Sequence, residues 1–424
     1  MDNNARLRCS IPILITTIFT GCAKTTSTLD AINSNTPTIP VEPKNVVYSS
    51  WSYDSSRTPK ISLLTPPWPA GASAVWGSVG RDHRGHIYVG ASCESASGAS
   101  AHLLEYDSVK NGWADLGGAV EQLKRLKLAK PSESQNKIHT KIWQATDGYL
   151  YFASMDESGE LDDGTVLPVY GSHLWRTKPG SKEWEHLKAV PEGIIAATLG
   201  GSSIYFLGYF GHVVYRFDTK TGAITHTRIG ATGGHVSRNL FADGRGHAFV
   251  PRVRSGRASL VELNGELDEV KATELSDYDV SPNAESHGIV SWTAMKDGSI
   301  CFLTDGGRLY RVAVGIVRDL GRIHPDGAAY VSCLMSPEGE RWLCGIGHKS
   351  LKGEPSYEWI VHDLLNKKTS LKPLTIPVSP SDAKGVLIYG SMTRDDAGRW
   401  CVGGAYRSGP RSGDFTPAVW RVEW

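Results

Sequence analysis

Histidine, tyrosine and arginine recur at equivalent positions of a repeated sequence unit, and together they suit proton transfer beside a bound anion. Imidazole titrates near neutral pH, a phenol can act as acid or base, and a guanidinium can hold a carboxylate or sulfate. The residues that we predict to be catalytic are His139, His173, Tyr209 and Arg238. The residues that we predict to bind substrate are His212, His235, Arg252, Arg254, His287 and Tyr330.

These residue types match one reaction better than others. The sequence has no G-x-S-x-G nucleophile motif and no convincing pair of isolated carboxylates for glycoside hydrolysis. Elimination from a uronic acid needs neither of them. In that reaction a cation neutralises the C5 carboxylate, a base removes the C5 proton, and an acid protonates the departing O4. The residues therefore predict β-elimination.

A glycine in a tight turn, followed by a short aromatic or β-branched run, marks each repeat. The spacing between these glycines is 41 to 63 residues. They are Gly85, Gly148, Gly201, Gly246, Gly298, Gly339 and Gly398. A third strand is expected after each hairpin, at 102–107, 173–178, 213–218, 258–264, 308–313, 357–363 and 418–424. Together with a weaker fourth strand, this period predicts an all-β fold, a seven-bladed β-propeller.

The last repeat lacks its fourth strand, because the sequence stops after the third one. Lys60-Ile-Ser-Leu-Leu-Thr-Pro near the N-terminus can supply the missing strand and close the ring, which also covers a sheet edge. We therefore predict one propeller over residues 60–424, closed by an N-terminal strand that completes the last blade.

Propeller topology should bring the candidate site residues together at one end of the central channel. The start of each innermost strand and the loop between the second and third strands lie on the same rim. The strand starts that we expect are Trp76, His139, Glu192, Ser237, Ile289, Tyr330 and Tyr389. Each histidine taken alone is more often a structural group, so the prediction rests on their gathering on blades two to five.

Three segments of the second repeat resemble a known family. They are Ile138-His139-Thr140-Lys141, Asp147-Gly148-Tyr-Leu-Tyr-Phe and Gly171-Ser172-His173-Leu174-Trp175-Arg176. This pattern is similar to the paired-histidine blade of propeller-type polysaccharide lyases, namely the ulvan lyases and, more distantly, the oligogalacturonate lyases. The resemblance implies a lyase that acts on an anionic algal or plant polysaccharide and holds a structural divalent metal, zinc or calcium. His139 and His173 carry over directly, whereas Tyr209 with Arg238 or Arg252 is our choice, and no metal ligands follow.

The N-terminus predicts export. Arg6 and Arg8 precede an apolar run over residues 11–19, which is too short to span a bilayer. The following Gly21-Cys22 resembles a bacterial lipobox, although Phe19 stands where Leu is usual. We expect a signal peptide over 1–21, a lipid on Cys22, a polar tether over 22–59 and an outer-membrane location, periplasmic or cell-surface. An ordinary signal peptide is the alternative.

Composition restricts the partners. Lys and Arg number 45 against 44 Asp and Glu, so the charge balance gives no reason to expect nucleic acid. We expect a monomer that binds an anionic polysaccharide and contacts the membrane through its lipid alone. The first hypothesis is a lyase of uronate-containing polysaccharide, and the second is a non-catalytic propeller that binds glycan or a protein. A lactonase-type metal hydrolase is a third, for which the inner positions offer Glu192 and Glu285.

Overall fold

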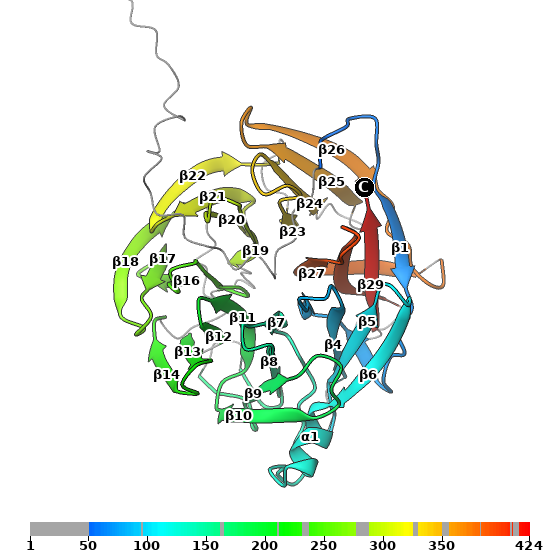
Figure 1. The fold of residues 1–424 in the computed structure, drawn as a ribbon, viewed down its shortest axis with the longest axis vertical. Helices are drawn as coiled ribbons and strands as arrows, with labels where there is room; N and C mark the ends of the chain where they lie inside the picture. The colour runs from blue at the N-terminus through cyan, green and yellow to red at the C-terminus, as the bar shows by residue number, and fades with distance from the viewer. Residues whose placement is uncertain are drawn as a thin grey trace, which may run out of the picture. The chain divides into compact units, whose positions relative to one another are not determined.

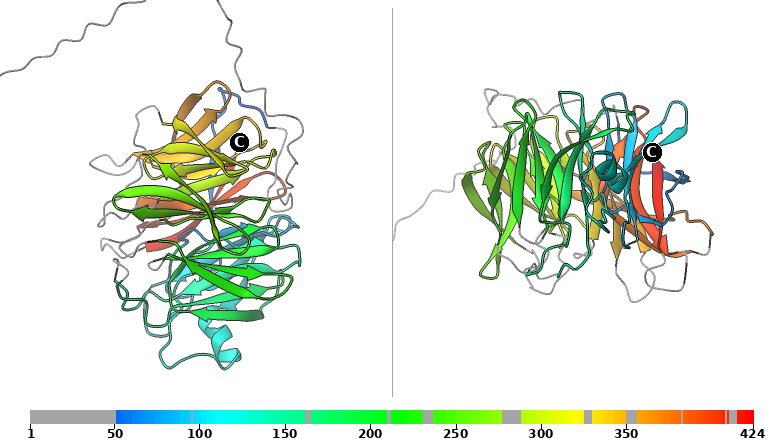
Figure 2. Two further views of the ribbon diagram at one scale, coloured as in Figure 1. Left: turned by 90° about the vertical axis from the view of Figure 1, so that its left-hand side faces the viewer. Right: turned by 90° about the horizontal axis from the view of Figure 1, so that it is seen from below.

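Short antiparallel sheets follow one another around a ring in the computed structural model (Figure 1). The structure describes residues 51–424 except 95, 162–164, 210–211, 231–236, 277–287, 325–329, 350–355, 382, 408 and 410–414. Seen from the side, the strands run from one face of the ring to the other (Figure 2). The chain is thus an all-β propeller, as its repeats predict.

Five blades are separate four-stranded sheets. One comprises β11 (Ile194–Gly200), β12 (Ser203–Gly208), β13 (Val213–Asp218) and β14 (Ile224–Arg228). The next comprises β15 (Phe241–Ala242), β16 (Ala248–Arg254), β17 (Arg257–Leu263) and β18 (Glu269–Leu275). Then follow β19 (Ile289–Ala294), β20 (Ile300–Thr304), β21 (Arg308–Ala313) and β22 (Ile316–Arg322), and after them β23 (Tyr330–Met335), β24 (Trp342–Lys349), β25 (Ser356–Asp363) and β26 (Lys368–Leu374). The fifth combines β1 (Lys60–Leu64) with β27 (Lys384–Arg394), β28 (Trp400–Arg407) and β29 (Phe415–Glu423).

The first two repeats do not form separate blades, which corrects the predicted count of seven. Their strands lie in one nine-stranded sheet. It holds β2 (Ala72–Ala74), β3 (Val79–Arg81), β4 (Ile87–Cys93), β5 (His102–Asp107), β6 (Gly112–Gly118), β7 (Trp143–Gln144), β8 (Leu150–Met155), β9 (Ser172–Thr177) and β10 (Trp184–Val190).

A close approach of two inner strands joins these repeats. Arg81 of β3 pairs in parallel with Trp143 of β7. A Cβ atom on Gly80 would lie 1.9 Å from the carbonyl oxygen of Ile142, so only glycine permits this approach. The parallel bridge therefore merges two repeats that the glycine pattern counts separately.

The ring closes as predicted, through the N-terminal strand. β1 pairs with β29 in antiparallel register from Lys60 opposite Glu423 to Leu64 opposite Val419. The seven predicted turn glycines all have positive φ, between 57° and 85°. Strands β5, β13 and β21 have the predicted bounds, while β9, β17 and β25 begin one residue earlier.

Aromatic and aliphatic side chains fill the space between neighbouring sheets. Phe241, Phe249, Trp292 and Phe302, for example, pack β15 and β16 against β19 and β20. Between β6 and β7 the chain forms the short helix α1 (Ala119–Arg125) on the outside of the ring (Figure 1). Within the described part of the chain, no helix has the length and apolar character that crossing a membrane requires.

Candidate functional site

One end of the central channel holds a small basic cavity. Its walls include Trp76, His139, Lys141, Arg238 and Asn239, which come from three different repeats. The cavity has a volume of about 20 Å³, and none of the eleven described residues that line it is acidic. Among the predicted site residues, the structure thus brings His139 and Arg238 together.

His139 is a neutral base in this cavity. Its Nδ1 lies 3.0 Å from the carbonyl oxygen of Ile195, which can only accept, so Nδ1 carries the proton and Nε2 keeps a lone pair. Burial, with Arg238 and Lys137 nearby, lowers the pKa of His139 well below its usual value. The imidazole can therefore accept a proton but carries no charge at neutral pH.

Lys137 lies close to the same cavity, two residues before His139. Its Nζ forms an ion pair with Glu157 and lies 5.0 Å from the centre of the Trp76 ring. Burial lowers the pKa of Lys137 and Arg238 lowers it further, whereas Glu160 opposes the shift. Part of the positive charge at this end of the channel is thus already balanced by carboxylates that follow β8.

His173 does not face the cavity that His139 lines. It is 4% exposed, and both of its ring nitrogens have partners inside the blade. Nε2 lies 2.9 Å from Glu133, and Nδ1 lies 2.9 Å from Nε2 of His186. Because the carboxylate accepts, His173 donates from Nε2 and accepts from His186 at Nδ1. The structure thus does not bring His173 together with His139, the residue with which the resemblance pairs it.

The other predicted residues that the structure describes also lie apart from the cavity. Tyr209 is 6% exposed within an apolar cluster, and His212 is 2% exposed against Gly230. Arg252 binds both carboxylate oxygens of Glu269, at 2.5 and 2.9 Å. Arg254 ends β16 as an exposed residue.

Several predictions lie outside the described residues. They are His235, His287, Glu285, the side chain of Tyr330, the signal peptide and the lipidated Cys22. The remaining inner-strand carboxylate, Glu192, accepts a hydrogen bond from the phenol of Tyr215 and is not among the residues that line the cavity.

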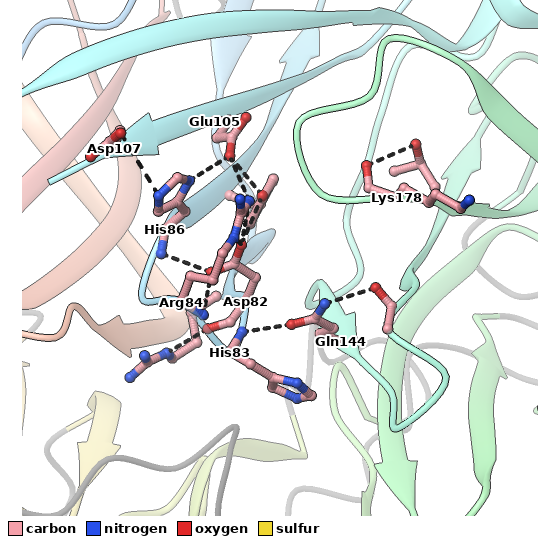
Figure 3. A network of polar contacts seen from close by, with 12 residues as sticks. Asp82, His83, Arg84, His86, Glu105, Asp107, Gln144 and Lys178 are labelled. Carbon is pink, nitrogen blue, oxygen red and sulfur yellow. Dashed lines mark hydrogen bonds and ion pairs between the residues drawn. The ribbon is translucent and has the colours of Figure 1, made fainter. Parts of the chain in front are cut away.

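A potential metal site exists in the first repeat. Ligand-type atoms of Asp82, His86 and Glu105 lie within 4.8 Å of one another (Figure 3). Asp82, however, accepts the backbone N–H groups of Arg84 and His86 and also binds the Arg84 side chain. His86 lies 2.7 Å from Glu105.

The same network recurs without any need for a metal. Asp243 binds the side chain of Arg245 at 2.7 Å, and Arg245 and His247 each lie 2.7 Å from Glu262. In both repeats an arginine supplies the positive charge that a cation would bring. The three residues therefore fit a blade-turn network rather than the zinc or calcium site that the family resemblance implies.

Sequence reasoning missed Lys141 as a site residue. Burial lowers the pKa of Lys141 to about 8, and its Nζ lies 4.9 Å from the centre of the Trp292 ring. Trp292 in turn stacks on Trp143, with ring centres 5.7 Å apart. The signal was present, because Lys137, His139, Lys141 and Trp143 occupy every second position leading into an inner strand.

Comparisons with known proteins agree with the fold. No protein-family model and no curated protein matches the chain. A chain of the mitotic checkpoint complex gives a TM-score of 0.52 at 8% identity, over 95% of this chain and 99% of that one. U3-55K and the WD40 repeats of RRP9 each give 0.50 at 13% identity, over 86% and 85% of this chain and 98% and 96% of theirs. At these identities the likeness shows the fold alone, so the chain is a β-propeller and the resemblance to polysaccharide lyases stays a prediction.

Proposed function

We propose that this protein is a non-catalytic propeller that binds an acidic glycan at the channel end lined by Trp76, His139 and Arg238. The observation that carries the proposal is the charge of this cavity: Arg238 and Lys141 line it together with His139, and no described lining residue is acidic. Burial is the main cause of the lowered pKa of His139, and a bound anion would offset the further lowering by Arg238 and Lys137.

The aromatic group suits a sugar. Trp76 is half-buried and lines the cavity beside the cations, with Nζ of Lys137 5.0 Å from the centre of its ring, and an indole next to positive charge suits a uronate ring. A carboxylate would pair with the guanidinium of Arg238 while the sugar ring packs on the indole. Neutral glycans lack the carboxylate and would bind more weakly.

The test is calorimetric titration of the purified full chain with polygalacturonate, ulvan and neutral dextran. We expect binding to an acidic polymer that weakens with added salt, and a loss of roughly tenfold or more in affinity for Arg238→Gln, since a charge-assisted hydrogen bond contributes about 1.5–3 kcal/mol. Arg176→Gln is the matched control, because Arg176 lies on β9 and pairs with Glu185 at 2.7 Å. Equal affinity for dextran, or equal losses in the two variants, contradicts the proposal.

Cleavage of an ulvan-like polymer by β-elimination is a second candidate, and one observation favours it. His139 is held as a neutral base beside Arg238, which are two of the groups that elimination requires. His173 lacks the access that a catalytic partner needs, so His139 would act as base with Arg238 neutralising the carboxylate. Elimination produces a conjugated uronate, and a rise in ultraviolet absorbance that His139→Ala abolishes would establish the lyase. No such rise on any uronate polymer leaves binding as the function.

We also propose that the propeller is carried at the outer membrane by a lipid on Cys22. The lipobox-like Gly21-Cys22 and the polar segment after it support this location. Cys22→Ser should release the protein from the membrane fraction when both chains are produced in a bacterial host that lipidates such cysteines. A variant that fractionates like the parent chain would contradict the anchor.

A further inference from the structure

A second cavity lies in the channel beyond Lys141, and it differs in character from the first. Its walls come from the inner parts of β3, β7, β19, β23 and β27, so strands of four different sheets contribute to it. Its volume is about 80 Å³, several times the space that one water molecule occupies. The cavity is thus large enough for a small ligand and lies on the axis of the ring.

Three cationic side chains line this cavity, and one of them, Arg81, pairs with Asp396, which is not among the lining residues. The three are Arg81, Lys141 and Arg394, and none of the fifteen described lining residues is acidic. Arg81 and Arg394 are each 5% exposed. Burial lowers the pKa of Arg394, and the nearby Arg81 adds a smaller lowering, whereas Cys344 and Asp395 oppose the shift.

Two buried donors of the cavity wall have no hydrogen-bond partner. They are Nη1 of Arg81 and Nε1 of Trp292. Native proteins pair nearly all such donors, with protein groups, water or a ligand. Arg81 is already held in place, with Nη2 on Asp396 at 2.5 Å and Nε on the carbonyl oxygen of Asp82 at 3.1 Å. Its Nη1 is thus a buried donor without a hydrogen-bond partner, on a guanidinium that the other two nitrogens hold in place.

The rest of the wall is apolar. Ile142, Leu334, Met335 and Met392 line it together with the stacked rings of Trp143 and Trp292. Inorganic oxyanions are polar on every side and would leave this surface without a matching partner. We infer that the cavity binds a small organic carboxylate, with its charged group at Arg81, Lys141 and the Trp292 indole and its apolar part against the methionines.

The test uses benzoate as the probe, with inorganic phosphate and benzyl alcohol as comparisons, titrated into the full chain by calorimetry. We expect benzoate to bind more tightly than either comparison. Its affinity should fall as pH rises through about 8, because the Lys141 ammonium that attracts it loses its proton there. Benzyl alcohol binding as tightly as benzoate, or phosphate binding more tightly, overturns the inference.

Two variants test whether benzoate binds at Trp292 and Lys141. Trp292→Phe keeps the aromatic ring but removes the unpartnered N–H, and we expect about a fivefold loss of benzoate affinity. Trp359→Phe is the matched control, since Nε1 of Trp359 is also buried without a hydrogen bond but lies outside the cavity. Lys141→Met should weaken benzoate by tenfold or more. Undiminished binding in Trp292→Phe and Lys141→Met overturns the inference, whereas Arg238→Gln, which tests glycan binding at the other channel end, should leave benzoate affinity unchanged.

Discussion

Lys141 lines both channel cavities. Its lowered pKa means that burying the charged ammonium group there reduces the stability of the fold. In the unfolded chain a lysine titrates near 10.5, whereas in the fold burial lowers this pKa to about 8. Between these values the unfolded state binds more protons than the folded state. The free energy of unfolding therefore rises with pH across this window, by linkage.

We therefore predict that Lys141→Met stabilises the protein at pH 7. Removing a buried charge in favour of an apolar side chain of similar length should raise the free energy of unfolding by about 1–3 kcal/mol. The gain should shrink between pH 8 and 10.5 and vanish above it, because the parent lysine is then neutral in both states. Urea unfolding at pH 7 and pH 10.5 measures the difference, and an equal gain at both values contradicts the assignment of a buried ammonium.

His186 should contribute to unfolding in acid. Burial, with His173 next to it, lowers the pKa of His186 to about 4, below the value of about 6.5 expected in the unfolded chain. The unfolded state then binds more protons as pH falls from 6.5 to 4, so stability is lost over that range. We predict that His186→Gln flattens the pH dependence of urea unfolding in this window. Urea unfolding at pH 4 to 6.5 measures this change, and a slope equal to that of the parent chain contradicts the assignment.

At the scale of strands and sheets, local sequence predicts the hairpins and tertiary contact decides how they join. Each turn glycine marks a backbone position with positive φ, which is why strands such as β13 could be placed to the residue. The merging of two repeats depends on Gly80 meeting Ile142, a contact between segments 62 residues apart that no local pattern reveals.

The local sequence also could not predict which histidine side chains are buried inside a blade. His139 lines a cavity, whereas His173 lies inside the blade, where Glu133, 40 residues earlier, supplies a carboxylate. Burial of this kind depends on which loops fold back on the sheet. A rim assignment from strand position alone therefore cannot separate a channel-lining histidine from one inside a blade.

Gly80→Ala tests the junction of β3 and β7. The added methyl group would lie 1.9 Å from a backbone oxygen, so the inner strands must separate. We expect a loss of about 2 kcal/mol or more in the free energy of unfolding, typical of overpacking. Gly112→Ala is the control, since nothing lies within 4 Å of a Cβ at that position. Similar stability of the two variants in urea would show that the junction does not need glycine.

At the scale of the whole ring, closure depends on β1. A chain that begins at Trp51 keeps this strand, whereas one that begins at Pro66 leaves β29 with an unpaired edge. We predict that the shorter chain melts at a lower temperature and forms aggregates, because exposed edges pair with other chains. Thermal melting and light scattering of the two truncations measure this, and indistinguishable results would show that β1 is dispensable.

The β1–β29 pairing also determines how the propeller would carry a mechanical load. A pull applied at the N-terminus, against a partner held in the channel, acts along β1 and stretches all five of its residue pairs in shear. A pull between the two chain ends acts differently, because Lys60 lies opposite Glu423 and the pairs would open one after another from that end. The same strand should therefore resist an anchored, ligand-bound pull strongly and yield readily when the two termini are drawn apart.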